Sequence, residues 1–561
     1  MEGKNVILAI VLSSMVLIGW AFFFEPPVVE QNTVEEKISK NQDSASPSID
    51  DDKKNIASEI SRNEIINNTK RIKVENENIK GSISLEGAII DDIIFKNYNE
   101  TLDSKNKVIF LNPKNSNNEY FIETGWASGG NEKIKLPLID TIWKVKGNNV
   151  LTSNGSVLLE WDNGEGLIFT KKIELDEKFL FKVTQVVKNN SEKSFQFYPY
   201  AQITRRGKPE GRQIYILHEG FLGVFGEELK EENFDDIEKE KFKISSSKGW
   251  LGITDKYWLT AIVPEKGSEF KAEFVAKNQK YRANYIIKDP KILNPGNTIT
   301  NELNAFVAAK EVAAIDNYAE QLKIEKFDLA IDWGWFYFFT KPLFFVIDYF
   351  FKMTGNFGLA IVIITALVRL IFFPLANYSF KSMAKMKILQ PEMLRLKELH
   401  KNDKTKLQQE MMALYKREKV NPISGCLPVL IQIPFFFAIY KMLYVTLEMR
   451  HQPFFGWIKD LSERDPTSIF NLFGLIPWDP PTFLMIGAWP ILMGLSMYVQ
   501  QKLNPTPPDP VQAKIFMFFP LFLTIILAPF PSGLVVYWTI NNILTIAQQW
   551  VIMRGTKVKT V

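Results

Sequence analysis

Residues 355–375 read GNFGLAIVIITALVRLIFFPL, an apolar run interrupted by one charged residue, Arg369. About 20 apolar residues suffice for a helix to cross the roughly 30 Å hydrocarbon core of a bilayer. Further apolar runs follow at residues 427–447, 483–499, 515–530 and 533–553. We therefore expect residues 353–561 to form an all-α transmembrane bundle with a five-helix core.

Arg369 is the residue of this bundle that most needs an explanation. A guanidinium inside a span costs roughly 2.5–3.5 kcal/mol on insertion scales, and the other apolar runs contain no Asp or Glu to pair with it. Two readings stay open: a hydrated cavity, or a side chain that extends toward the nearer membrane surface. Polar residues that could share such a cavity are Thr365, Gln432, Gln500, Asn541, Asn542 and Thr545.

The N-terminal part of the chain contains one more apolar run, residues 6–24, preceded by Lys4. Its length and the bulky residues at its end favour an uncleaved transmembrane signal anchor over residues 1–27, with a cleaved signal peptide as the alternative. Residues 28–68 are rich in Asn, Ser, Asp, Glu and Lys and poor in aromatic residues. Such a composition cannot bury enough apolar area to order itself, so we expect a flexible linker.

Residues 69–325 change to a hydrophobic period of two, which indicates half-buried strands. The alternating positions include Ile83/Leu85, Val157/Leu159/Trp161, Phe179/Phe181/Val183 and Tyr281/Ala283/Tyr285. Asn154-Gly155 and Asn163-Gly164 are hairpin signals, and Pro295-Gly296 marks another turn. We expect a large antiparallel β-sandwich. Its His218-Glu219 pair is the only candidate there for a catalytic pair, and we expect the two residues to be an ordinary loop pair without a catalytic role.

The distribution of basic residues predicts the topology. Residues 381–419 carry eleven Lys and Arg against five acids, so this loop should be cytoplasmic. If the aromatic stretch 331–352 does not cross the membrane, this loop lies in the cytoplasm together with both termini, and the sandwich lies outside. We expect it to be an interfacial amphipathic helix, with Trp333, Trp335 and Tyr337 at headgroup depth.

The basic loop itself predicts a helical hairpin over residues 379–419, broken at 400–404. Its apolar faces are rich in methionine, whose flexible side chain adapts to varied apolar partners. The alternative is that these faces simply pack together. The methionines that we expect to contact clients are Met383, Met386, Met411 and Met412.

Several function classes are excluded by composition. A net charge of +4 without a basic and aromatic patch argues against nucleic-acid binding. One cysteine and three scattered histidines give no metal site, and no GxxxxGK[ST] motif or activated nucleophile appears, so we expect neither a cofactor nor an enzyme. A transporter or channel is a rival reading, although no inverted repeat is visible. A third alternative is a carbohydrate-binding module with a membrane anchor, but this function would not explain the five further apolar spans.

The chain resembles the YidC/Oxa/Alb family of membrane protein insertases, in its Gram-negative YidC type. The resemblance is carried by residues 355–375 and by four further segments: FDLAIDWGWFYFFTKPLF (327–344), NPISGCLPVLIQIPFFFAIYKML (421–443), PSGLVVYWTINNILTIAQQ (531–549) and GWLGITDKYWLTAIVP (249–264). It runs from the anchor to the C-terminus.

The resemblance implies a chaperone-like insertase of the bacterial inner membrane that moves hydrophobic segments of nascent membrane proteins from the cytoplasm into the lipid bilayer, alone or with the Sec translocon (SecYEG, SecDF). It implies a hydrophilic groove closed to the periplasm, where the sandwich would lie. The family's groove arginine falls on Arg369, its substrate-contacting threonine and aromatic on Thr365 and Trp538, and its groove glutamine on Gln500, with Gln432 added. The tail after Arg554 is short, so the ribosome stays an open partner.

Overall fold

The computed structural model describes residues 60–129, 134–209, 217–418, 420, 427–478, 480–481, 484–504 and 510–555. The expected N-terminal anchor and most of the expected linker lie outside these residues.

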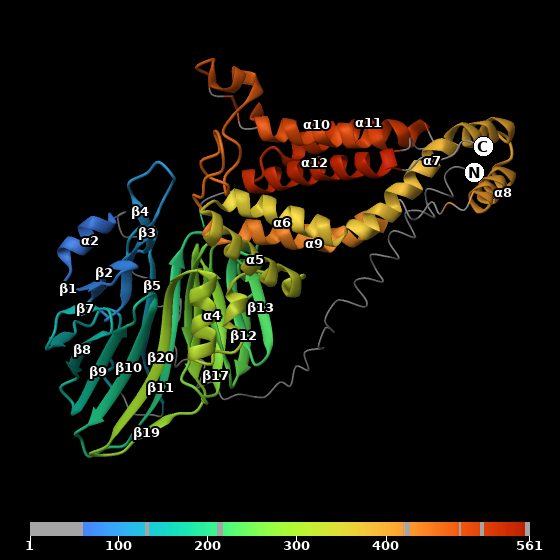
Figure 1. The fold of residues 1–561 in the computed structure, drawn as a ribbon. Coiled ribbons are helices and arrows are strands. Elements are labelled where there is room, and N and C mark those ends of the chain that lie inside the picture. The colour runs from blue at the N-terminus through green and yellow to red at the C-terminus, as the bar shows by residue number, and fades with distance from the viewer. Residues whose placement is uncertain are drawn as a thin grey trace. The chain divides into compact units, whose positions relative to one another are not determined.

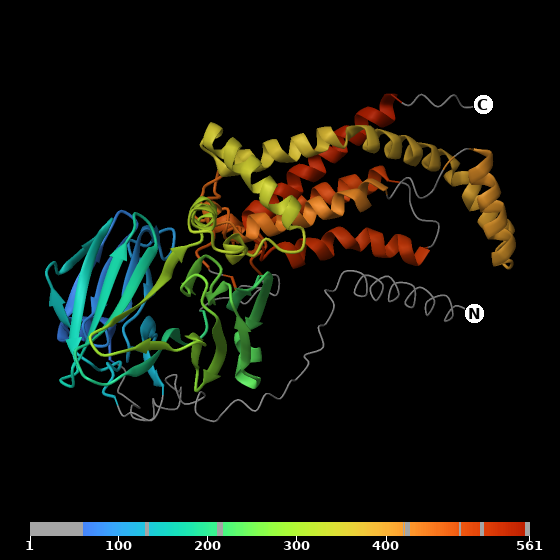
Figure 2. The same cartoon turned by 90° about the horizontal axis from the view of Figure 1, so that it is seen from below.

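The β domain consists of two sheets (Figures 1 and 2). The 11-stranded sheet has, in spatial order, β14 (Phe242–Ser246), β17 (Phe270–Lys277), β18 (Lys280–Ile287), β11 (Phe195–Arg206), β5 (Tyr120–Gly129), β3 (Ile90–Asn99), β2 (Ile79–Ser84), β1 (Arg71–Glu75) and β7 (Val150–Thr152), with β19 (Lys291–Leu293) on β11 and β4 (Lys107–Leu111) on β3. The 9-stranded sheet has β13 (Glu228–Asn233), β12 (Gly220–Phe225), β15 (Gly249–Thr254), β16 (Trp258–Val263), β20 (Thr298–Ala309), β10 (Leu180–Asn189), β9 (Leu167–Leu175), β8 (Gly155–Asp162) and β6 (Lys144–Lys146).

Aromatic side chains join the two sheets in one core. The rings of Phe95 on β3 and Trp258 on β16 stack at 4.8 Å, and those of Phe169 on β9 and Phe197 on β11 meet edge to face at 6.1 Å. The alternating residues singled out in the sequence are buried here, except Trp161, which is half-buried. The predicted sandwich is confirmed. Among the described strands, the pairing of β1 with β7 is parallel, which departs from the antiparallel expectation.

The three predicted turns exist, but only one closes a hairpin. Asn163-Gly164 joins β8 to its antiparallel neighbour β9, with Gly164 at φ +75°. Asn154-Gly155 joins β7 to β8, which belong to different sheets, so the predicted hairpin there is wrong. Pro295-Gly296 likewise turns the chain from β19 in one sheet to β20 in the other. A turn dipeptide reverses the chain whether or not the flanking strands pair.

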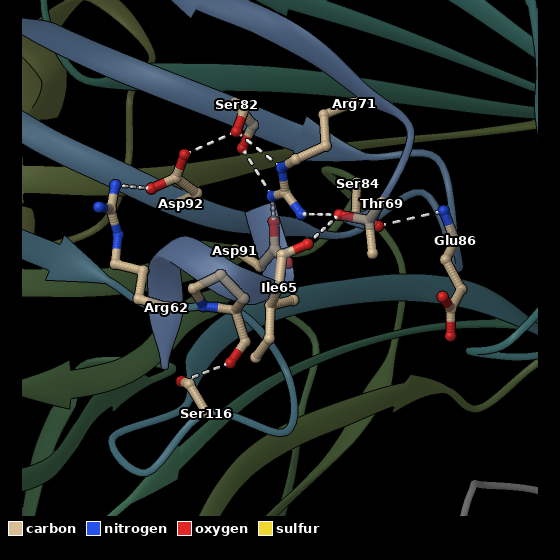
Figure 3. Close-up of polar contacts among 11 residues, drawn as sticks. Arg62, Ile65, Thr69, Arg71, Ser82, Ser84, Glu86, Asp91, Asp92 and Ser116 are labelled. Carbon is tan, nitrogen blue, oxygen red and sulfur yellow. Dashed lines mark hydrogen bonds and ion pairs between the residues drawn. The ribbon is translucent and has the colours of Figure 1, made fainter. Parts of the chain in front are cut away.

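The last residues of the predicted linker, 62–68, form a helix. Helix α2 (Arg62–Asn68) is capped by Ser61, and the Arg62 guanidinium forms an ion pair with Asp92 of β3 (Figure 3). A second buried pair joins Arg71 and Asp91, and the Ser82 hydroxyl lies between the two pairs: it accepts from Arg71 Nε at 2.7 Å and donates to Asp92 at 2.6 Å. Residues 62–68 are therefore docked on the sandwich, which their polar composition did not predict.

The remaining helices follow the sandwich or interrupt it. They are α3 (Phe234–Lys239), α4 (Val312–Gln321), α5 (Tyr337–Thr354), α6 (Phe357–Ile371), α7 (Phe373–Leu399), α8 (Lys404–Arg417), α9 (Leu427–Val445), α10 (Ala488–Leu503), α11 (Pro510–Leu527) and α12 (Ser532–Gly555), with short 3₁₀ turns η2 (Phe327–Ala330), η4 (Leu447–Met449) and η5 (Ile469–Gly474).

Helix α5 lies within the stretch that we expected to be interfacial, and its apolar residues divide between a buried and an exposed face. Leu343, Phe344 and Ile347 are buried against the neighbouring helices, whereas Phe345 and Tyr349 are exposed. Of the three aromatic residues that we expected at headgroup depth, Trp333 does not lie on the surface. Trp335 is 86% exposed, but Trp333 is buried against Phe344 because the chain packs there before α5 begins.

The arginine-containing span is bent. Helices α6 and α7 meet at 68°, where Pro374 opens α7 and Phe372 leaves helical geometry. Among the described residues no single helix is both long and apolar enough to cross a bilayer, and by length and composition the bent pair α6–α7 is the one that meets this test.

The other predicted helices have shifted ends. The predicted break at 400–404 is confirmed, since α7 ends at Leu399 and α8 begins at Lys404. Helix α10 begins at Ala488, five residues after the predicted start at 483, with Gly487 in extended conformation as its N-cap residue. The tight turn at Pro529-Phe530-Pro531 is confirmed between α11 and α12.

Candidate functional site

The candidate site begins on α6, which carries Thr365 and Arg369 one turn apart. Asn356 caps this helix by accepting from the Leu359 N–H at 2.9 Å. Arg369 lies in the last turn, where the partial negative charge of the helix C-terminus favours a cation. The Thr365 hydroxyl is buried and donates to the Ile361 carbonyl of its own helix at 2.6 Å. Local backbone chemistry thus positions both side chains.

Arg369 is held by a neutral partner from the far end of the sequence. Its Nε and Nη2 atoms both donate to Asn541 Oδ1 of α12, at 3.0 and 2.8 Å. Within the described part of the chain, no carboxylate forms an ion pair with the Arg369 guanidinium. An amide orients a guanidinium without cancelling its charge, so the half-buried cation keeps its net charge at the meeting of α6 and α12.

Helix α12 presents more polar side chains toward α10. Asn542 Nδ2 donates to Ser496 Oγ at 3.0 Å, and Gln549 Nε2 donates to Asn504 Oδ1 at 3.1 Å. These bonds join two helices that pack closely along their length. Asn542 is therefore engaged in helix packing, whereas Asn541, its neighbour in sequence, faces Arg369.

The structure brings some of the predicted residues together and leaves others apart. Trp538 lies one turn before Asn541 on α12, and its half-buried ring packs edge to face on Phe436 of α9 at 4.9 Å. Gln500 is half-buried near the end of α10. Gln432 belongs to α9, but its side chain lies outside the described residues.

The hairpin methionines differ in their surroundings. Met412 on α8 is 49% exposed, and Met386 and Met411 are half-buried. Met383 packs against a small cluster of Ala376, Phe380 and Ile552, which joins α7 to α12. Packing therefore accounts for Met383, while Met412 offers an accessible apolar surface.

The His218-Glu219 pair has structural partners. The His218 backbone N–H donates to Asp332 at 3.0 Å and its ring Nε2 lies 2.8 Å from the Phe221 carbonyl oxygen. Glu219 accepts from the Lys256 N–H at 2.8 Å. Burial lowers the pKa of His218. In the described residues no group of three or more His, Cys, Asp or Glu side chains is arranged to hold a metal ion.

A polar junction between the sandwich and the helices was missed by the sequence reasoning. Lys441 of α9 forms a 2.6 Å ion pair with Asp332, which precedes α5. Glu448 accepts from the Val312 N–H at 2.9 Å, and Arg450 donates to the Asn99 carbonyl at 2.7 Å. A lysine inside an apolar run and an aspartate in an aromatic stretch were the available signals, but only the fold reveals that they pair.

Two family models match the chain. The model for the 60Kd inner membrane protein matches residues 349–559, and the model for the YidC periplasmic domain matches residues 71–346. The boundary between them falls in the middle of α5.

Full-length relatives carry one name. A protein of Pelagibacter ubique (strain HTCC1062), named membrane protein insertase YidC, is 56% identical over 563 residues, which cover 100% of both chains. A protein of the same name from Methylobacterium nodulans is 43% identical over all of this chain and 96% of its own length. A crystal structure described as an active YidC insertase has 18% identity and a TM-score of 0.34, with 85% of this chain and 92% of that chain covered.

Proposed function

This chain belongs to the YidC family of membrane protein insertases, and from that premise we propose that Arg369 receives the polar flank of a client segment during insertion. The protein is a non-enzymatic inner-membrane transport protein with a periplasmic domain, and its substrates are nascent membrane proteins. The proposal concerns how its residues act.

The observation that carries the proposal is the pairing of Arg369 with an amide instead of a carboxylate. A cation that is oriented but not neutralised attracts acidic residues in a client's flank. Each charge that enters a polar site avoids part of the desolvation cost of crossing lipid. The membrane potential then favours outward passage of an acidic residue by roughly 2.3 kcal/mol per charge per 100 mV. Burial of the client's apolar segment in lipid supplies the remaining driving force.

The other groove residues are proposed as the walls of the same path. Thr365 lies one turn from Arg369, and Trp538 one turn from Asn541, so both border the point where α6 meets α12. Gln500 and Gln432 would extend the polar surface along α10 and α9. Met383, Met386, Met411 and Met412 would contact the client's apolar segment before it enters.

The proposed topology places both termini and the α7–α8 hairpin in the cytoplasm. It rests on the positive charge of residues 381–419 and on the expectation that α5 lies along the membrane surface without crossing it. The proposed divisions are an anchor (1–27), a linker (28–68) whose last residues form α2, the sandwich (69–325), the interfacial helix (331–352) and the core (353–561), which contains the hairpin (379–419).

The proposed partners beyond the clients are the Sec translocon, SecYEG with SecDF, and the ribosome. Their support is the family to which the chain belongs. Insertion of a client in vesicles with and without SecYEG would distinguish insertion by this protein alone from insertion together with the translocon.

The test is complementation of depleted cells, with insertion of a short single-span client scored by protease protection. We expect Arg369→Ala to lower insertion about tenfold and Arg369→Lys to retain part of it, because a lysine keeps the charge but not the two-point contact with Asn541. Arg395→Ala is the matched control, since Arg395 is an exposed arginine of α7 outside this site. Normal insertion by both Arg369→Ala and a Thr365→Ala/Trp538→Ala double variant at low expression would contradict the assignment.

A further inference from the structure

An apolar tip lies between α9 and α10, at residues 469–478. Its exposed side chains are Ile469, Phe470, Leu472, Phe473, Leu475, Ile476 and Trp478, and Leu475 is 83% exposed. No charged residue occurs from Pro466 to Trp478. A cluster of large apolar side chains without charges at its edge is unusual on a surface that faces water.

The tip is a built structure. Ser468 is buried and accepts from the Phe470 N–H at 3.2 Å, and its hydroxyl donates to the Leu484 carbonyl at 3.1 Å. The Phe473 and Ile476 N–H groups donate to the Ser468 and Asn471 carbonyls at 2.7 and 3.0 Å. These bonds satisfy several backbone groups inside the segment, which lowers the cost of moving it out of water.

The base of the tip is fixed to the helix bundle. Asp465 is buried and accepts from the Trp489 N–H in the first turn of α10 at 2.9 Å, from Trp457 Nε1 at 3.1 Å and from the Thr467 hydroxyl at 2.6 Å. Figure 1 shows this orange segment leaving the end of α10 sideways, across the helix axes and not along them. The tip therefore projects toward the space that lipid occupies around the bundle.

The end of the bundle that carries the tip also contacts the sandwich. Arg450, in the same segment, donates to the backbone carbonyls of Asn99 and Glu100 in the β domain at 2.7 and 2.9 Å. Because the β domain is periplasmic, the tip lies at the periplasmic side of the membrane.

We propose that the apolar tip inserts into the periplasmic leaflet of the lipid bilayer and anchors the α9–α10 segment there. A lipid surface fits it better than a protein partner, because no charge interrupts residues 466–478 and the exposed side chains there are almost all large and apolar. Trp457 and Trp478, both partly exposed, suit the headgroup boundary. The anchor would hold the outer ends of α9 and α10 at a fixed depth while the inner ends admit a client.

The experiment measures the depth of the tip in the full-length protein. Cys426 is the only cysteine, so Cys426→Ser gives a background in which Leu475→Cys carries a single environment-sensitive fluorophore. The labelled protein is placed at one copy per nanodisc, with or without phosphatidylcholine bearing a nitroxide on its acyl chain. Lys459→Cys is the matched control, because Lys459 is exposed in the same segment but outside the tip.

We expect the label at position 475 to emit at shorter wavelength and to be quenched about twofold or more by the nitroxide lipid, with position 459 unaffected. Emission at position 475 that matches position 459 would overturn the proposal. A blue-shifted label that the lipid does not quench would also overturn it, since protein would then cover the tip.

A second variant keeps the test independent of the label at position 475. With the fluorophore at Ile476→Cys, the added change Leu475→Asp should lower quenching about twofold or more, because a carboxylate resists transfer into lipid. Unchanged quenching would count against insertion of the tip.

Discussion

At the scale of single residues, the contact between Arg369 and Asn541 explains how a cation can persist inside a helical bundle. The sequence indicated the need for compensation, because no acidic residue was available in the other apolar runs. It also named Asn541 among several polar candidates. It could not select among them, since α6 and α12 are far apart in the chain and their rotation about their own axes depends on packing.

Asn541→Asp should therefore impair insertion although it is nearly isosteric. The new carboxylate would lie where Asn541 Oδ1 now accepts from Arg369 and would form an ion pair that cancels the charge offered to clients. We expect insertion of an acidic-flanked client to fall on the order of tenfold, with expression unchanged. Asn541→Ala is the control: it loses the contact but leaves the charge, so its loss should be smaller. Wild-type insertion by Asn541→Asp would contradict this role.

Glu448 predicts a pH dependence outside the membrane spans. Burial, with smaller contributions from Glu311 and Asp348, raises the pKa of this carboxyl to about 7, although the Val312 N–H opposes the shift. A folded-state pKa above the unfolded value of about 4.3 means that the folded protein holds a proton that the unfolded chain releases. Stability should fall as pH rises between these values, by up to about 4 kcal/mol.

The measurement is thermal unfolding of the purified protein in detergent at pH 5 and pH 8. The midpoint of the wild type should be lower at pH 8. Glu448→Gln, which mimics the protonated form, should remove most of this difference. An equal pH difference in both proteins would show that other groups cause it.

At the scale of elements, the sequence was most reliable where one periodicity governs a whole segment. The period of two in Tyr281/Ala283/Tyr285 placed those side chains in the core, and the charged stretch at residues 400–404 marked the break between α7 and α8. It failed where pairing depends on distant strands. Asn154-Gly155 carries the same hairpin signal as Asn163-Gly164, yet β7 pairs with β1, a strand about 75 residues away, instead of with β8.

The packing of α10 on α11 gives a prediction for a single methyl group. A Cβ added at Gly494 would lie 2.0 Å from Thr524 Oγ1, closer than any stable contact. Gly494→Ala should therefore separate the two helices and destabilise the protein by about 1–3 kcal/mol, the usual cost of overpacking. Thermal unfolding in detergent measures this loss.

The compensating change distinguishes this clash from a general effect of alanine. Thr524→Ala removes the offending oxygen, so the Gly494→Ala/Thr524→Ala double variant should recover part of the stability lost by Gly494→Ala. If the two changes simply add, the close approach of α10 and α11 at this point is not what Gly494 provides.

At the scale of the whole molecule, composition and periodicity sufficed to divide the chain into a polar β domain and an apolar helical region. They said nothing about how the two are joined. The junction depends on residues such as Asp332, Lys441 and Arg450, each unremarkable in its own segment. Their roles follow from the fold, because ion pairs between distant segments leave no pattern in a single sequence.

The ion pair of Lys441 with Asp332 provides the test of that junction. The Asp332 carboxylate accepts from Lys441 Nζ at 2.6 Å and from the His218 N–H at 3.0 Å, so one side chain connects α9, the chain before α5 and the β domain. Both side chains are mostly buried. Lys441→Met would therefore remove the positive charge that balances the Asp332 carboxylate. Removal of one partner from a buried pair costs about 3–5 kcal/mol, and residual exposure here reduces the expected loss to about 1–3 kcal/mol.

The double variant Lys441→Met/Asp332→Asn removes both charges and keeps an acceptor for the His218 N–H. It should therefore regain about 1–2 kcal/mol relative to Lys441→Met alone, as a coupling energy in thermal unfolding. Limited proteolysis between β20 and α5 gives an independent reading, because a loosened junction exposes that connection: cleavage should be faster in Lys441→Met than in the double variant. Equal cleavage of the wild type and Lys441→Met would mean that the sandwich is held on the helices by its other contacts, with the ion pair contributing little to the joint.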